Sequence, residues 1–312
     1  MLLRFRRPEA VELAQEGCRE HGTFVMSTGR VEPTMTLGYS NILGRKASLA
    51  AQRFIFPGLV WNQERYGNVL REHLHPAGKL RWLEAGCGHR VLPNGLESLE
   101  KSAVKDAGFV VGMDMDRSSL RNHRSIDRRV MGSIRDLPFA DGSFDLVGCN
   151  MVVEHLADPG QCLAELTRVL APNGVLLVHT PNIKNYMVFL KHAATRLLPT
   201  KLTAWIVHSA EQRSEDDIFP TLYRMNSSGR LQKAARDLGL QVESEEFLNG
   251  PRPFFSFFLP LAVVQLIIMR LLTLPGLHKF QTTILAVMRK PAHPAAVSAR
   301  VVAEAADRRI GV

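Results

Sequence analysis

Short apolar runs alternate with stretches of helical periodicity over most of the chain after residue 60. The apolar runs read LRWLEAG, FVVGMD, RRVMGSI, FDLVGCN and GVLLVHT, and helical patterns lie between them at about 96–107 and 160–170. Strands that alternate with helices are typical of βαβ units and a parallel sheet. The pattern therefore predicts a doubly wound α/β domain that begins near Leu80.

Further elements are predicted on both sides of this region. Apolar residues at helical spacing indicate an amphipathic helix within 61–74. A helix capped by Ser227 or Ser228 and stopped by Gly239, a strand from about Leu240 and a last strand in FQTTILAVMRK follow later. We expect an N-terminal extension over 1–60, a main domain over 61–290 and a C-terminal tail over 291–312.

The composition limits the class of protein without naming it. Hydrophobic and charged shares of 46% and 22% are close to those of ordinary globular domains. The formal net charge of +9 favours anionic partners such as nucleic acid, anionic lipid or an acidic substrate, and equally fits a soluble protein with a basic surface. The scattered cysteines fit a reducing compartment, and no secretory signal is visible, so we expect a cytoplasmic location.

A glycine-containing turn follows the first strand of the main domain. In LEAGCGHR, Glu84, Gly86 and Gly88 lie where the strand gives way to a predicted helix. Glycines at such a point let the backbone turn tightly and approach a nucleotide-like ligand, although a tight turn without a ligand is an alternative. The dinucleotide fingerprint would need glycine at position 91, where this chain has Val91, so NAD is disfavoured.

The second strand ends in two carboxylates, Asp114 and Asp116. A carboxylate at this strand end is positioned to accept hydrogen bonds from a ribose diol, and Asp114 is the favoured candidate. Either residue could instead cap the following helix. The separation of Asp114 from the glycines also predicts an extended loop around HRVLPNG.

The later segments SIRDLPFADGSFDLVGCNMVVEHLADP and RVLAPNGVLLVHTPN resemble motifs of class I S-adenosylmethionine-dependent methyltransferases, in particular the small-molecule group that includes ubiquinone-biosynthesis methyltransferases. The likeness covers about 80–182 and, more loosely, 220–290. It implies a mostly parallel seven-stranded sheet of the Rossmann-like methyltransferase fold, with S-adenosyl-L-methionine as cofactor.

The resemblance also implies roles for individual residues. It places Glu84, Gly86 and Gly88, with Cys87 between them, at the methionine end of the cofactor, and Asp114 at the ribose beside Met115. Ser133 and Ile134 would lie beside the adenine, and Asn150 would flank the sulfonium. Two departures are Arg90, where many relatives have a third glycine, and Ser133, where many have Asp or Asn. Asp136 could supply the adenine contact instead, or could be a turn residue.

Glu154 and His155 follow the fourth strand and are the candidate catalytic residues, because an oxygen or nitrogen nucleophile must lose a proton. The pair could instead orient the helix and loop around it. Some quinone-pathway relatives bind a divalent metal through a Glu-x-x-Glu-His run, but here the first position is Met151. A thioether is a poor ligand for a hard ion, so no metal is predicted.

An apolar insertion over 254–277 separates the last two predicted strands. Its length approaches the ~20 residues that span a bilayer, but Pro260, Gln265 and Arg270 interrupt it, and a span would put two adjoining strands on opposite sides of a membrane. A buried helical hairpin, a lid over an apolar substrate and a helix in the membrane interface all remain open. The segment 183–219 is a second predicted lid.

Several functions therefore fit the sequence. The insertion favours methyl transfer to an O, N or C nucleophile of an apolar or membrane-derived small molecule, with peripheral contact to an anionic membrane as one interpretation. Alternatives are methylation of a soluble metabolite or sugar, and a non-catalytic regulatory protein that binds S-adenosylmethionine. Nucleic acid is disfavoured as a partner because the positive residues are dispersed and no RNA-binding module is visible.

Overall fold

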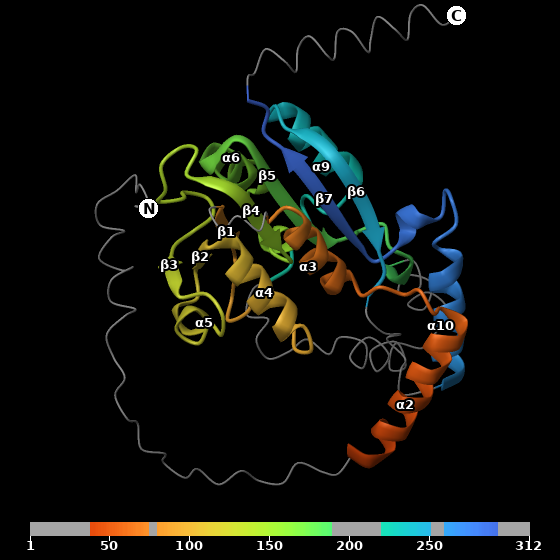
Figure 1. Ribbon diagram of the computed structural model, residues 1–312. Helices are drawn as coiled ribbons and strands as arrows, with labels where there is room; N and C mark the ends of the chain where they lie inside the picture. Colours follow the sequence, from red (N-terminus) through yellow and green to blue (C-terminus); the bar gives the residue numbers. More distant parts are fainter. Residues whose placement is uncertain (1–37, 75–79, 189–219, 251–258, 293–312) are drawn as a thin grey trace, which may run out of the picture.

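A seven-stranded sheet in the order β3-β2-β1-β4-β5-β7-β6 forms the centre of the computed structural model (Figure 1). The structure describes residues 38–74, 80–188, 220–250 and 259–292. Strand β7 is antiparallel to both of its neighbours, and the other pairings are parallel, which confirms the predicted mostly parallel sheet. The strands are β1 (Arg81–Ala85), β2 (Phe109–Asp114), β3 (Arg128–Met131), β4 (Phe144–Asn150), β5 (Leu170–Pro181), β6 (Gln241–Leu248) and β7 (Thr283–Arg289).

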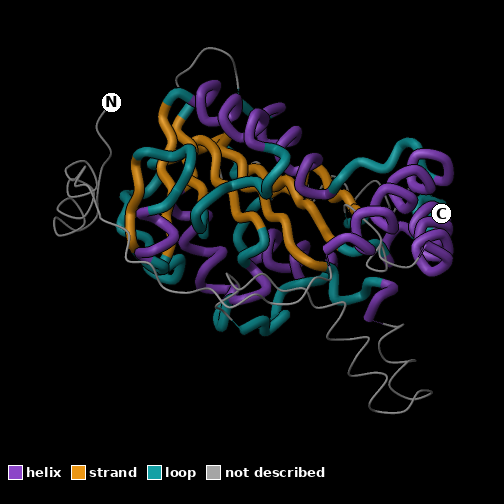
Figure 2. The backbone as a smooth tube through the Cα atoms, turned by 90° about the horizontal axis from the view of Figure 1, so that it is seen from below, coloured by secondary structure: helices purple, strands orange, loops and turns teal. Residues whose placement is uncertain are grey.

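Helices cover both faces of the sheet (Figure 2). Side chains alternate across a strand, so in β1 Leu83 joins the core under α6 and α9, whereas Trp82 joins the core under α3 and α4. The helices of the described residues are α2 (Gly38–Ile55), α3 (Asn62–Glu72), α4 (Glu97–Ala107), α5 (Arg117–Arg121), α6 (Pro159–Val169), α9 (Ser228–Asp237) and α10 (Leu259–Leu271), with the 3-10 turns η1 (Val153–His155) and η2 (His278–Phe280). The helices predicted around 61–74, 96–107, 160–170 and 227–239 are thus confirmed.

The extended loop predicted after β1 is present and runs to the start of α4. A buried ion pair holds it: the carboxylate of Glu100 accepts from the Leu92 backbone N–H at 2.8 Å and pairs with the Arg124 guanidinium at 2.6 Å. Glu100 has no exposed side-chain surface. Hydrogen bonds to Arg124 and Ser125 keep the pKa of Glu100 below its ordinary value although burial opposes this. These contacts therefore hold the loop in one conformation against α4.

The apolar insertion contains α10, and residues 251–258 at its start lie outside the described residues. Strands β6 and β7 are neighbours, as the sequence predicts, so the chain returns to the sheet after α10. Helix α10 buries Ala262, Gln265, Leu266 and Met269 but leaves its other face exposed, so a wholly buried hairpin does not describe it. Among the helices of the described residues, none combines the length and the apolar character that crossing a bilayer needs.

Other predicted segments are seen only in part. Most of the predicted lid over 183–219 lies outside the described residues, as do 1–37 of the N-terminal extension and the tail after 292. The rest of the extension forms α2 and the link to α3. The domain boundaries therefore stay predictions.

Candidate functional site

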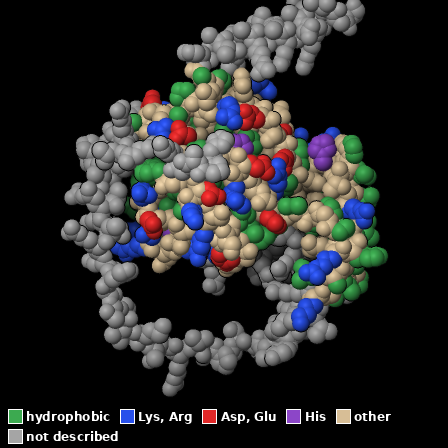
Figure 3. All heavy atoms as spheres, in the orientation of Figure 1, with side chains coloured by type: hydrophobic (Ala, Val, Ile, Leu, Met, Phe, Trp, Pro, Cys, Tyr) green, Lys and Arg blue, Asp and Glu red, His purple; other side chains and the backbone are tan. Residues whose placement is uncertain are grey.

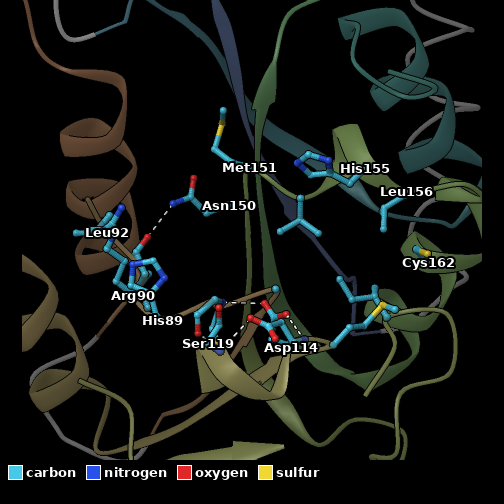
Figure 4. A pocket seen from close by; sticks show the side chains of 18 of the residues that line it. His89, Arg90, Leu92, Asp114, Ser119, Asn150, Met151, His155, Leu156 and Cys162 are labelled. Atoms are coloured by element: carbon cyan, nitrogen blue, oxygen red, sulfur yellow. Dashed lines mark hydrogen bonds between the residues drawn. The ribbon is translucent and has the colours of Figure 1, made fainter. Parts of the chain in front are cut away.

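A cavity of about 860 Å³ lies at the carboxyl ends of β1, β2 and β4. The sheet order reverses between β1 and β4, and ligands of doubly wound folds bind at such a switch point. Figure 4 shows Asp114 and Ser119 at one end of the group of side chains, with Met151 and His155 at the other. Its walls come from the turn after β1, the ends of β2 and β4, the loop after β3 and the residues before α3.

The glycine turn forms the floor of this cavity. Gly86 and Gly88 have φ of +76° and +53°, a backbone region that favours glycine. A Cβ on Gly86 would meet Cγ2 of Val152 at 2.4 Å, whereas a Cβ on Gly88 would meet nothing within 4 Å. Gly86 is thus required for packing, and Gly88 leaves open space where a ligand can approach the backbone. Both glycines and Cys87 line the cavity, and their contact with the methionine end of the cofactor stays a prediction.

The carboxylates of Asp114 and Asp116 accept hydrogen bonds from different backbone segments. Asp114 accepts from the backbone N–H of Gly88 at 2.8 Å through one oxygen and from that of Asp116 at 2.9 Å through the other. Asp116 accepts from the backbone N–H groups of Ser118 and Ser119, so it is the N-cap of α5. The capping alternative therefore holds for Asp116, and Asp114 joins the end of β2 to the glycine turn. Met115 is exposed and lines the cavity beside them.

Glu84 is not among the residues that line the cavity. Its buried carboxyl group accepts hydrogen bonds at 3.1 Å from the Tyr66 hydroxyl and from Nε1 of Trp82. Burial raises the pKa of Glu84 to about 8, against the opposing effect of these two donors. Any action of Glu84 on the methionine end would pass through the turn, and that role stays a prediction.

Asn150 ends β4 and its side chain is held at both ends. Its Nδ2 donates to Oε1 of Gln63 at 2.8 Å and to the Val91 carbonyl at 3.0 Å, and its Oδ1 accepts from Nδ1 of His179 at 2.8 Å. Burial lowers the pKa of His179 to about 3, so its imidazole is neutral at physiological pH. Asn150 therefore ties the loop after β1 to β4, β5 and α3 while it lines the cavity.

The predicted adenine residues divide into two groups. Ser133 and Ile134 line the cavity, and Ile134 is buried. Asp136 is exposed and does not line it; its backbone N–H donates to the Ser133 carbonyl at 3.1 Å, as in a tight turn. The turn alternative thus describes its backbone. A contact of Asp136 with adenine stays a prediction that this geometry does not support.

Glu154 and His155 lie in different surroundings. The Glu154 side chain is 3% exposed and accepts from the Thr180 hydroxyl, and its backbone carbonyl accepts from the N–H groups of Leu222 and Tyr223. His155 lines the cavity, and its Nδ1 lies 3.2 Å from the Pro220 carbonyl. A proton on Nδ1 satisfies that carbonyl and leaves the lone pair on Nε2. Only His155 of the predicted pair therefore borders the cavity.

Several lining residues were not predicted from the sequence. Trp61 and Gln63 come from the start of α3, and Leu156 and Cys162 from the other side of the cavity. Met151 was considered only as a missing metal ligand, yet it lines the cavity with φ of +57°, which is rare for a residue with a side chain. Their place in the sequence could have identified them, because most of these residues follow the end of a predicted strand or flank a predicted helix.

The described residues contain no group of three His, Cys, Asp or Glu side chains placed to hold a metal ion. The prediction of no metal stays a prediction.

Residues 83–178 match the family model of a methyltransferase domain. A probable S-adenosylmethionine-dependent methyltransferase of Mycolicibacterium smegmatis is 35% identical over 46% of this chain and 54% of its own length. A malonyl-[acyl-carrier protein] O-methyltransferase of Erwinia pyrifoliae is 35% identical over 38% of this chain and 44% of its own. A ubiquinone biosynthesis O-methyltransferase of Burkholderia cenocepacia is 28% identical over 37% and 50%.

These matches confirm the coarser predictions from the sequence. The matched segment is similar to methyltransferase domains, and the relatives named as S-adenosylmethionine-dependent methyltransferases support an enzyme of class I with S-adenosyl-L-methionine as cofactor. The matched segment ends before α9, β6, α10 and β7, and the chain spans about half the length of the curated relatives it matches. The matches therefore do not extend to the methyl acceptor of the whole chain.

The lining of the cavity fits this cofactor. The glycine turn offers close backbone approach for the methionine end, and a carboxylate suited to ribose hydroxyls lies one hydrogen bond from it. Ile134, Leu156 and Met115 offer apolar surface for a flat base.

Proposed function

We propose that this chain transfers a methyl group from S-adenosyl-L-methionine to an O, N or C nucleophile of an apolar or membrane-derived small molecule. The observation that carries the proposal is the hydrogen bond between Asp114 and the Gly88 backbone on the floor of the cavity. It joins the residues suited to the ribose and to the methionine end into one unit, so binding either part of the cofactor orients the other.

The chain's own residues supply binding and alignment. Asp114 would accept from the ribose hydroxyls, the turn at Gly86 and Gly88 would hold the methionine end, and Ile134 would contact the adenine. Asn150 fixes the wall beside the predicted methyl position through its bonds to Val91 and His179. When bound, S-adenosyl-L-methionine supplies an activated methyl group, so most of the acceleration comes from placing the acceptor in line with it.

His155 is the proposed base. His155 would accept at Nε2 the proton that the nucleophile loses as it takes the methyl group, which bound S-adenosyl-L-methionine would supply while its sulfur keeps the bonding electron pair. The bond of Nδ1 to the Pro220 carbonyl orients the ring for this transfer. Glu154 then acts as a positioning residue, because its side chain and backbone join η1 to β5 and to the segment after residue 220.

The apolar acceptor is supported by the exposed apolar side chains of α10, which follows β6 at the cavity edge of the sheet. The resemblance to ubiquinone-biosynthesis methyltransferases has weaker support. The ubiquinone biosynthesis O-methyltransferase is 28% identical to this chain, whereas the malonyl-[acyl-carrier protein] O-methyltransferase, whose name gives a different acceptor, is 35% identical. A cytoplasmic location belongs to the same proposal, whereas peripheral contact with an anionic membrane is a separate one.

Two measurements test the proposal. Titration calorimetry should show binding of S-adenosylmethionine and its demethylated product, and tight binding of NAD with no response to either would refute it. Incubation with methyl-labelled cofactor and fractionated cell extract should then label material in the organic phase, and the variant His155→Asn, which should still bind cofactor, is the control. Label in polar metabolites would favour the soluble-acceptor alternative, and cofactor binding without transfer would favour a regulatory protein.

A further inference from the structure

Helices α2 and α10 pack against each other beside the main sheet (Figure 1). Met269 and Leu272 are buried in a separate apolar cluster with Tyr186, and Phe56 and Leu59 from the link after α2 pack against it. Gln265 of α10 donates to the Tyr186 hydroxyl at 2.8 Å, and Arg270 donates to the Ile55 carbonyl at 2.6 Å. The pair is therefore anchored on its inner side.

The outer side of this pair is apolar and exposed. Phe54 is 87% exposed and Val264 is 52% exposed, although burying such side chains is favourable. These residues define the α2/α10 face, which comprises Leu49, Phe54, Leu261, Val264, Ile267, Leu271, Leu274 and Leu277. Exposed apolar side chains that gather on two packed helices are typical of an interaction site.

The charge around the α2/α10 face has one sign. The chain has 30 Asp and Glu residues, yet none occurs in 38–63 or 259–292. Lys46, Arg53, Arg270 and Lys279 are exposed in these segments. In Figure 3 the side of the molecule where α2 and α10 lie carries hydrophobic side chains beside Lys and Arg, without Asp or Glu. Apolar side chains flanked by basic ones complement an anionic lipid surface.

We propose that the α2/α10 face binds the surface of an anionic lipid bilayer, with its apolar side chains in the interface and its basic side chains at the head groups. Helix α10 has only 13 residues, so it would lie in the interface rather than cross it. A second copy of this chain would complement the apolar residues but would bring like charges together, because a symmetric contact places the same basic residues on both sides.

The face and the cavity lie at the same edge of the sheet. Strand β6 runs parallel to β1 and β4, so its carboxyl end, which leads to α10, lies at the edge where the cavity is. Helix α2 is also close to the cavity along the chain, because residues 56–60 link it to Trp61, which lines the cavity. A bilayer on this face would bring a membrane-resident acceptor near the cavity. The delivery of a membrane-resident acceptor to the cavity rests on the proposed function, whereas the membrane contact of the α2/α10 face does not.

Flotation of the full chain with vesicles tests the proposal. The protein should float with vesicles of phosphatidylcholine and phosphatidylglycerol, float far less with phosphatidylcholine alone, and be released by high salt. The variants Phe54→Glu and Ile267→Glu, and the double variant Lys46→Glu/Arg53→Glu, should each weaken binding at least about tenfold. Val242→Glu at the exposed start of β6 and Lys105→Glu on α4 are matched controls that should float like the wild type.

Four results would overturn the proposal. They are no flotation with anionic vesicles, equal loss of binding in the control variants, a stable dimer that Ile267→Glu dissociates, and resistance of the bound protein to both salt and carbonate washes. Each variant is also titrated with S-adenosylmethionine, since the face variants should bind it normally. A chain that floats but does not bind the cofactor would refute the proposed function alone.

Discussion

The Asp114 carboxylate and the Gly88 backbone N–H are 2.8 Å apart, and their hydrogen bond holds the end of β2 to the turn that follows β1. The other oxygen of Asp114 accepts from the Asp116 N–H, so one side chain positions two backbone segments that line the cavity. This contact gives Asp114 a structural role in addition to its proposed contact with the ribose.

Asp114→Ala should therefore weaken binding of S-adenosylmethionine more than Asp116→Ala does. Loss of hydrogen bonds to a charged acceptor costs about 1.5–3 kcal/mol, or roughly ten- to a hundredfold in affinity. Asp116→Ala removes the cap of α5 and should lower thermal stability with little change in affinity. Calorimetric titration and thermal denaturation of both variants separate the two effects. Equal losses of affinity would show that the ribose contact is assigned to the wrong carboxylate.

Gly86→Ala should destabilise the fold, whereas Gly88→Ala should mainly reduce cofactor affinity. Both residues have positive φ, which costs a Cβ about 1–2 kcal/mol. Only at Gly86 does the new Cβ meet a neighbour, Cγ2 of Val152 at 2.4 Å. At Gly88 it would enter open space that the ligand needs. Denaturant unfolding and titration of both variants check the prediction, and comparable stability with comparable affinity would contradict it.

The glycine turn and Asp114 could be predicted from sequence because each belongs to a local pattern. A short apolar strand followed by glycine, or by a carboxylate, places those residues at the carboxyl edge of a parallel sheet. The strands and most helices were predictable for the same reason, since alternation of apolar and polar positions reports burial directly.

The partners of Glu84 and Asn150 could not be predicted in this way. Glu84 contacts Tyr66 of α3, and Asn150 contacts Val91 and His179, from elements distant in sequence. Such contacts depend on how the helices and loops pack against the sheet, and no local sequence pattern predicts this packing. The positive φ of Met151, two residues before η1, likewise has no signal in the sequence.

His155→Asn should lower kcat by about 10²- to 10⁴-fold with little change in fold stability or cofactor affinity, because a base is lost at the cavity wall. Glu154→Ala should instead lower stability by about 1–3 kcal/mol, since it leaves the buried Thr180 hydroxyl without this acceptor. Single-turnover assays and denaturant unfolding distinguish the two. A larger effect of Glu154→Ala than of His155→Asn on the chemical step, at unchanged stability, would reverse the assignment.

The last prediction concerns Glu84, whose pKa burial raises to about 8 from an ordinary value of 4.5. The folded state then binds the proton more tightly than the unfolded chain, so the contribution of Glu84 to stability is full below the ordinary pKa. It is lost as the pH rises through about 8. In Glu84→Gln this loss is absent. The free energy of unfolding of the variant, compared with the wild type, should therefore improve by a few kcal/mol between about pH 5 and about pH 8.5.

Glu100→Gln provides the control for this measurement. Hydrogen bonds from Arg124 and Ser125 keep the pKa of Glu100 low, so its stabilising contribution is present throughout that pH range and is lost only in acid. Its substitution should produce a deficit that does not change between about pH 5.5 and about pH 8.5. Urea unfolding without ligand is the measurement. Parallel pH profiles for Glu84→Gln and the wild type would show that Glu84 is already ionised in the folded protein, with Tyr66 and Trp82 stabilising a buried carboxylate instead of a neutral acid.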